Sequence, residues 1–268
     1  KTHWSDTNRV MLRNRRIGCS ASGVAQFITN RGLDELRNWL ESGYNVIQDW
    51  DKMYSDWFAV PRSIKTTSVK PSGTVSLLAG ATPGLHYPES RFYIRRVRVS
   101  KHSELIEPLK KAKYKVEPAF GSEDTTMVVE IPVDVGEGIR TASELSIWEQ
   151  FSLAAFMQRH WADNQVSCTV TFDPKTEGIQ IPHVLNYYQY HLKGISLLPR
   201  HELGAYKQMP YESIDEKEYN KQVKKLGKLS FGVIKQEEAN IEKFCDGDFC
   251  DVEIVPTTGD NDDQDYAN

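Results

Sequence analysis

The stretch KPSGTVSLLAGATPG, residues 70–84, carries the most information about the fold of this chain. Three β-branched residues precede it, Thr66, Thr67 and Val69, and a short apolar run follows its Pro-Ser-Gly-Thr turn. This order predicts a strand that leads into a tight turn and then into the start of a helix. An ordinary capped turn has the same pattern, because Ser is a frequent helix N-cap.

A phosphate site is the second interpretation of the same turn. Ser72 is expected to cap the helix, and Gly73 lets the backbone come close to a ligand. The first N–H groups of a helix lack partners within it, so they form a favourable environment for an anion. This interpretation predicts a site for a phosphate group at Pro71, Ser72, Gly73, Thr74, Val75 and Ser76.

Motifs beyond this turn resemble a known family over nearly the whole chain. They are RRIG (15–18), TPGLHYP (82–88), RFYIRRVR (91–98), DNQVSCTV (163–170) and the pair Cys245 and Cys250. Together with the Pro-Ser-Gly-Thr turn, they resemble the adenosylcobalamin-dependent (class II, monomeric) ribonucleoside-triphosphate reductases.

The resemblance implies an α/β fold, namely the C-terminal part of a ten-stranded α/β barrel. The acidic composition from Asp246 onward, with few bulky apolar residues, predicts a disordered acidic tail. In that family the Pro-Ser-Gly-Thr loop holds the substrate's phosphates at the end of a barrel strand. The cobalt–carbon bond of adenosylcobalamin breaks homolytically, a cysteine thiyl takes the 3′ hydrogen, and two cysteines reduce the 2′ position. Corrin contacts are expected near residues 81–99 and 199–238, with cofactor binding assigned to Thr82, Pro83, Gly84 and His86.

The sequence between Cys245 and Cys250 has four residues, one of them Gly, so this pair can close into a disulfide. A zinc site is the alternative, but it needs four ligands, and no second Cys or Cys/His pair has suitable spacing. The resemblance assigns Cys245 and Cys250 as catalytic redox-shuttle thiols that are reduced again by thioredoxin. Exchange of this kind needs an accessible pair.

Two features of the family have no counterpart in this sequence, the Asn-x-Cys-x-Glu radical loop and the effector-binding segment. We therefore expect a C-terminal portion of a reductase, and the first residue, Lys1, agrees with a truncated start. The expected divisions are a barrel portion (1–200), a helical or irregular segment (201–244) and a flexible tail (245–268). Such a chain alone is expected to be inactive and prone to aggregate.

Composition sets further limits. The chain has 268 residues, 39% hydrophobic and 26% charged, with a net charge of −4. These values are typical of a globular protein and argue against a protein that coats nucleic acid. No apolar run is long enough for a membrane span, and four scattered cysteines do not suit a secreted disulfide framework. We expect a cytoplasmic enzyme with no membrane or nucleic-acid partner and no metal site, and the resemblance implies a monomer.

Hydrophobic periodicity predicts alternating helices and strands. Helices are expected over 20–30, 33–42, 44–58, 142–161, 181–193 and 216–226. Strands are expected over 64–69, 92–99, 127–133, 165–172 and 195–198, with 127–133, the helix 142–161 and 165–172 as one strand–helix–parallel strand unit.

Several single residues also have predicted roles. Trp39, Trp50 and Trp57 have two interpretations, a stacking platform and core packing; we expect core packing, because large aromatic residues at helical spacing usually face inward. Cys168 is interpreted as a small buried hydrophobic residue. The arginines near the loop have two interpretations, a triphosphate or corrin site and a solvated basic strand; they are Arg91, Arg95, Arg96 and Arg98.

Two other function classes stay open from the sequence. One is a different α/β enzyme that binds a phosphorylated ligand on a Gly-rich turn, without cobalamin and without a role for the cysteine pair. The other is a non-catalytic remnant or interaction module. A radical loop encoded upstream of Lys1 would separate these alternatives from a reductase.

Overall fold

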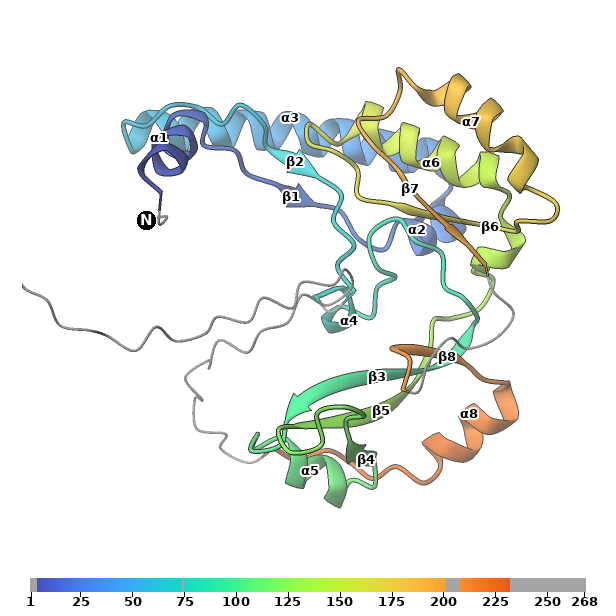
Figure 1. The fold of residues 1–268 in the computed structure, drawn as a ribbon. Helices are drawn as coiled ribbons and strands as arrows, with labels where there is room; N and C mark the ends of the chain where they lie inside the picture. Colours follow the sequence, from blue (N-terminus) through green and yellow to red (C-terminus); the bar gives the residue numbers. More distant parts are fainter. Residues whose placement is uncertain (1–3, 74, 201–207, 232–268) are drawn as a thin grey trace, which may run out of the picture. The chain divides into compact units, whose positions relative to one another are not determined.

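Parallel strand pairs form one part of the fold in the computed structural model, which describes residues 4–73, 75–200 and 208–231 (Figure 1). Strand β1 (Cys19–Ser20) pairs with β2 (Thr67–Ser68), and β6 (Thr169–Phe172) pairs with β7 (Ser196–Pro199), both in parallel. A parallel bridge between Val69 and Val166 joins the continuations of β2 and β6. The strands predicted over 64–69, 165–172 and 195–198 are therefore confirmed, although the paired residues span less than the predicted ranges.

Helices connect these parallel strands. Between β1 and β2 lie α2 (Val24–Arg31) and α3 (Leu33–Trp57); α6 (Ile147–His160) precedes β6; and α7 (Ile181–Tyr188) connects β6 to β7. Parallel strands need long crossovers of this kind, usually helical. The predicted α/β class is confirmed for this part of the chain.

The core lies between these helices and strands. Helix α6 buries Ile147, Phe151, Ala154 and Met157, which are three or four residues apart and so lie on one face of the helix. They belong to one cluster with residues of the strands and neighbouring helices, among them Val24, Leu40, Val69, Val166, Val170 and Val184. Full burial of one such aliphatic side chain contributes about 1.5–3 kcal/mol, so this cluster holds the strand ends in place.

Helix α3 differs from the prediction in two ways. The sequence predicts two helices that meet near Gly43, whereas the structure has one helix of 25 residues. A mid-helix Gly costs only about 1 kcal/mol, which is too little to end a helix that packs on α2 and α6.

The prediction that three tryptophans of α3 lie in the core is wrong. Their exposed fractions are 65% for Trp39, 47% for Trp50 and 67% for Trp57. Among the described residues of α3, only Leu36, Leu40 and Ser55 are buried, so the inward face of this helix is narrow. The aromatic residues pack along the helix instead, and Tyr54 lies 5.2 Å from Trp50 and 5.4 Å from Trp57 between ring centroids.

A four-stranded antiparallel sheet forms a separate part of the fold, in the order β4-β5-β3-β8. Its strands are β3 (Phe92–Ser100), β4 (Lys115–Pro118), β5 (Thr126–Asp134) and β8 (Tyr211–Ser213), and it carries α5 (Ile106–Lys111) and α8 (Glu216–Val223). The predicted parallel unit of 127–133 with 165–172 is therefore wrong, because β5 pairs antiparallel with β3 along nine residues. Apolar periodicity predicts a strand but does not identify the strand that pairs with it.

The remaining elements are short. They are α1 (Ser5–Asn14), α4 (Val75–Leu78) and the 3₁₀ turns η1 (Ala142–Glu144) and η2 (Gly178–Gln180). The helix predicted from residue 142 begins as η1, and α6 follows after Ser146, whose hydroxyl accepts a hydrogen bond from the Glu149 N–H. Within the described residues, none of the helices has the length and apolar character that a membrane crossing requires.

Candidate functional site

The loop predicted to bind phosphate lies between β2 and α4 and continues to Leu85. Ser72 has a left-handed backbone, with φ of 50°. Its carbonyl accepts hydrogen bonds from the Ser76 N–H at 3.0 Å and from the Ser76 hydroxyl at 2.6 Å. Thr74 lies outside the described residues, so the loop is described through Pro71, Ser72, Gly73, Val75 and Ser76.

The hydroxyl of Ser72 does not form the predicted helix cap among the described residues. It accepts a hydrogen bond from the Gly84 N–H at 3.0 Å and lies 2.6 Å from the hydroxyl of Ser22. Ser72 therefore joins three segments of chain: the turn, the Thr-Pro-Gly segment (82–84) and Ser22, two residues before the start of α2. Among the described residues, the hydroxyl oxygen of Ser72 thus accepts from the Gly84 N–H and not from an N–H of α4.

Residues at the start of α2 hold the far end of the loop. The N–H of Gly23 donates to the Thr82 carbonyl at 2.8 Å, and the N–H of Val24 donates to the Gly84 carbonyl at 3.3 Å. The Gln26 side chain accepts from the Thr82 N–H at 2.8 Å and donates to the Gly80 carbonyl at 3.1 Å. These bonds fix residues 80–84 against α2, so both ends of the loop are anchored on the same short segment.

The four residues predicted to contact a corrin lie in this anchored segment. Thr82 is 2% exposed, Gly84 is buried and Pro83 is half-buried. The Nε2 atom of His86 accepts from the Thr169 N–H at 3.3 Å, so Nδ1 carries the proton and donates to the Pro83 carbonyl at 3.3 Å. Burial lowers the pKa of His86, which keeps this imidazole neutral. Cofactor binding by these residues stays a prediction.

Arg91 directly precedes β3, and Arg95, Arg96 and Arg98 lie in it; neither interpretation from the sequence describes all four. Arg91 pairs with Asp134 at 3.2 Å and with Glu137 at 3.4 Å. Arg96 pairs with the buried Glu130 at 2.9 Å and also with Glu212. Carboxylates of the chain thus neutralise these two charges within the antiparallel sheet.

The other two arginines of this group differ from each other. Arg95 is 4% exposed and lies over the ring of Tyr211, 4.4 Å from the ring centroid. Arg98 is exposed. The group therefore does not act as one patch of positive charge.

Only two of the four cysteines lie in the described part of the chain. Cys168 is buried, and burial raises the pKa of its thiol to about 12, so the interpretation as a small hydrophobic residue is confirmed. Cys19 is exposed. Cys245 and Cys250 lie outside the described residues. Among the described residues, no group of three His, Cys, Asp or Glu side chains is placed to hold a metal ion.

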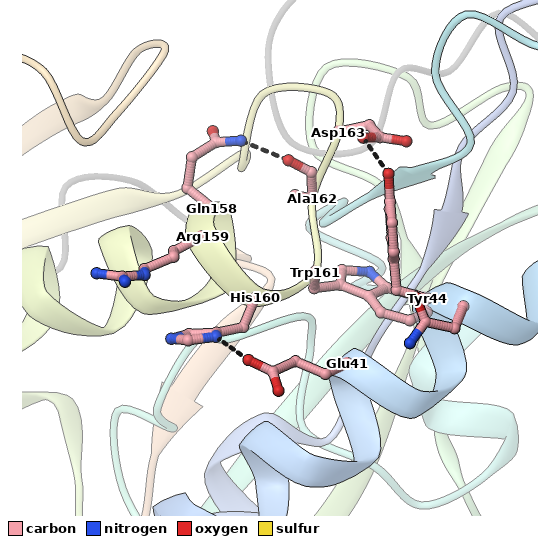
Figure 2. Close-up of a pocket in the computed structure, with 9 residues that line it drawn as sticks. Glu41, Tyr44, Gln158, Arg159, His160, Trp161, Ala162 and Asp163 are labelled. Atoms are coloured by element: carbon pink, nitrogen blue, oxygen red, sulfur yellow. Dashed lines mark hydrogen bonds and ion pairs between the residues drawn. The ribbon is translucent and has the colours of Figure 1, made fainter. Parts of the chain in front are cut away.

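A polar pocket of about 430 Å³ lies between α3 and the end of α6 (Figure 2), and its lining residues do not include the predicted site residues. Its side chains pair mainly with one another: Glu41 with His160 Nδ1 at 2.7 Å, and the Tyr44 hydroxyl with Asp163 at 3.0 Å. Burial opposes ionisation of Asp163, but hydrogen bonds from Thr66 and Tyr44 outweigh it and lower its pKa. Through Asp163, which accepts hydrogen bonds from the N–H and the hydroxyl of Thr66, this pocket wall is joined to the residue directly before β2.

Comparisons with known proteins identify relatives of the chain. It is 54% identical over 253 residues to an adenosylcobalamin-dependent ribonucleoside-triphosphate reductase of Euglena gracilis, which covers 92% of the chain and 35% of the relative. A probable enzyme of the same name from Dictyostelium discoideum is 55% identical, over 94% of the chain and 34% of the relative. The chain is homologous to adenosylcobalamin-dependent ribonucleoside-triphosphate reductases. The resemblance stated from the motifs is thereby confirmed.

The chain is also similar in structure to a solved reductase. A crystal structure of a B12-dependent (class II) ribonucleotide reductase superimposes with a TM-score of 0.73 at 32% identity, covering 83% of this chain and 35% of that one. No protein-family model matches the chain. The chain thus spans about a third of the length of the reductases that it matches.

Ser22 and Gln26 were not identified as site residues from the sequence. Ser22 lies 50 residues before Ser72, and Gln26 lies 56 residues before Thr82. Serine and glutamine at the start of a helix have no local pattern that indicates a contact so far away. The one sequence signal near Ser22 and Gln26 is the resemblance of residues 15–18 to a reductase motif.

Proposed function

We propose that this chain is part of an enzyme that reduces ribonucleoside triphosphates to 2′-deoxyribonucleoside triphosphates with adenosylcobalamin. The observation that carries the proposal is the 54% identity to the Euglena gracilis reductase over 92% of the chain. The TM-score of 0.73 against the class II reductase structure supports it through the fold. In the complete enzyme, the parallel strands of this chain would form part of the ten-stranded α/β barrel.

The role we propose for this chain is to hold the substrate's phosphates in the loop 71–76. The left-handed Ser72 and the close approach of Gly84 to Lys70 give the loop a fixed shape before any ligand binds. A preorganised loop loses little conformational entropy on binding, which favours affinity. Thr74 is included in the proposal from the sequence alone.

Adenosylcobalamin is proposed from the names of the relatives. In the described part of the chain, the predicted corrin residues have their backbone groups and ring nitrogens bonded within the chain, and the hydroxyl of Thr82 is buried. Corrin contact by Thr82, Pro83, Gly84 and His86 stays a prediction. Reduction by thioredoxin through Cys245 and Cys250, a monomeric state and a cytoplasmic location stay predictions.

The test is an assay of the complete reductase polypeptide that contains these residues. We expect deoxyribonucleoside triphosphate to form from ribonucleoside triphosphate only when both adenosylcobalamin and a dithiol are present. A diphosphate substrate in parallel checks the substrate class. Nucleotide binding without cobalamin-dependent reduction would instead favour a different α/β enzyme with a phosphorylated ligand.

A further inference from the structure

Helix α3 has a second apolar face besides the one that packs in the core of this chain. Trp39, Val46, Trp50 and Trp57 are seven, four and seven residues apart, so they lie along one line of the helix, which we call the aromatic seam. Each of these side chains is between 47% and 67% exposed. The buried Leu40 lies about 100° around the helix from Trp39, so the seam is not the edge of the buried face.

The rest of α3 is suited to water. Arg37, Glu41 and Lys52 are exposed and lie roughly opposite the seam. A helix that packs on one body and faces solvent on the other side needs one apolar face. Within the described residues, Trp39 contacts the ring of Phe27 with centroids 5.8 Å apart and still has most of its surface exposed. The second face therefore indicates contact with a second body.

The size of this surface supports that conclusion. The three tryptophans leave roughly 300–450 Å² of mainly apolar surface exposed, since a side chain of this kind presents about 150–250 Å² when it is free. Tyr54 and Phe58 are exposed at the same end of α3 and stack on each other, with ring centroids 6.2 Å apart. Soluble monomers rarely expose a contiguous apolar patch larger than a few hundred Å².

Helix α1 has the same property and is joined to α3. None of its ten residues is buried, and Val10, Met11 and Leu12 are between 40% and 57% exposed. A helix shorter than about 12–15 residues is only marginally stable in water without packing, so α1 also needs a covering partner. Residues 63–64 connect the two helices, because the Ser63 N–H donates to Asp51 of α3 and the Ile64 N–H donates to the Asn14 carbonyl of α1, both at 3.0 Å.

We propose that the aromatic seam is an intramolecular docking surface, covered in the complete reductase by an apolar segment of the polypeptide outside these 268 residues. The chain matches 35% of the Euglena gracilis reductase and 35% of the class II crystal structure, so about two thirds of each lies outside the matched region. The face with Leu36 and Leu40 already belongs to the core cluster with the parallel strands, which leaves the seam for another segment. The inference rests on the proposed function, because it needs a longer reductase polypeptide.

The test is hydroxyl-radical footprinting of the complete reductase polypeptide, with N-acetyltryptophanamide as an internal standard. We expect Trp39, Trp50 and Trp57 to be oxidised about tenfold more slowly than the standard, because large aromatic side chains at an interface lose most of their exposed area. Rates that instead follow the exposed fractions of 65%, 47% and 67% would overturn the inference. Nucleotide reduction is assayed on the same sample: an active enzyme with a freely oxidised seam removes the docking surface and leaves the proposed function, whereas a protected seam without activity does the reverse.

Two variants on the same helix add a matched comparison. Trp50→Glu places a carboxylate in the covered face, where an unpaired charge is costly, so the oxidation rates of Trp39 and Trp57 should rise towards that of the standard. Lys52→Glu introduces the same side chain on the polar face and should change neither rate. Trp50→Phe keeps the face apolar and should retain the protection. Equal rates in the two glutamate variants, with both folded by circular dichroism, would contradict the inference.

The occupant of the surface is tested separately. Protection that weakens on dilution would assign the surface to a second copy of the polypeptide. Protection that is lost when residues 233–268 are deleted would assign it to this chain's own C-terminal segment. Either result would overturn the inference, which requires protection that depends neither on concentration nor on those residues.

Discussion

The carbonyl oxygen of Lys70 lies 2.6 Å from the position that a Cβ atom on Gly84 would occupy. Real Cβ atoms do not approach a backbone oxygen so closely, and Gly84 also has a positive φ of 51°. The two ends of the loop therefore meet at a point where only glycine fits. This contact therefore helps to set the shape of the loop.

We predict that Gly84→Ala opens the loop. The left-handed backbone alone costs a non-glycine residue about 1–2 kcal/mol, and the added methyl group must also push the Lys70 carbonyl away. Amide hydrogen exchange within residues 70–86 should become faster, and the KM for the ribonucleoside triphosphate should rise. Gly178→Ala is the control, because its Cβ would meet nothing within 4 Å and its φ is not positive. Unchanged exchange in Gly84→Ala would show that the loop tolerates this contact.

Gly73→Val tests the loop as the place where phosphate approaches the backbone. A Cβ on Gly73 would lie 3.5 Å from the Tyr211 hydroxyl, an ordinary contact, so the substitution should not prevent folding. The branched side chain should block the ligand, and we expect a sharp rise in KM with little change in thermal unfolding. Gly73→Ala adds only one methyl group and should have a smaller effect. A normal KM in the valine variant would contradict the assignment.

The cysteine pair is tested by separating one turnover from many. Cys245→Ser or Cys250→Ser should leave a single reductive turnover intact but abolish repeated turnover with thioredoxin as the reductant, because only re-reduction is lost. Dithiothreitol reaches the site directly and should restore repeated turnover. Cys168→Ala, at a buried position with a raised thiol pKa, is the control. Full thioredoxin-driven turnover in either tail variant would show that the pair is not the shuttle.

Glu149 at the start of α6 gives a pH-dependent prediction. Hydrogen bonds from Arg140 and from Ser146 lower the pKa of Glu149 to about 2, below its ordinary value of 4.5. A lowered folded-state pKa stabilises the folded state fully above pH 4.5, and this contribution disappears as the pH falls from about 4.5 towards 2. Hydrogen-exchange protection in the first turn of α6 should therefore decrease over that range.

The matching variant removes the charge. Glu149→Gln should have reduced protection in this turn at pH 7 and little further change between pH 4.5 and 2. Glu107 on α5 forms an exposed ion pair with Lys110, and Glu107→Gln serves as the control. A wild-type-like pH profile in Glu149→Gln would show that another group is responsible.

The sequence alone determined the local elements and the family. Apolar residues with helical spacing predicted α6, alternation predicted β3, and the order of turn residues predicted a tight loop after β2. The motifs in 15–18, 70–98 and 163–170 were sufficient to indicate the reductases that the comparisons confirmed. The helix, the strand, the tight loop and the family motifs each depend on residues close together in the chain, so their patterns can be recognised in the sequence.

Only the tertiary structure decided which distant residues meet. It paired β5 with β3 rather than with β6, joined two predicted helices into α3 and left Trp50 and Trp57 exposed. It also brought Ser22 within 2.6 Å of Ser72, across 50 residues. Periodicity fixes which face of an element is apolar, but not which other element covers that face. Such choices depend on packing of the whole chain, since each partner is selected by burial and by backbone hydrogen bonds made far away in sequence.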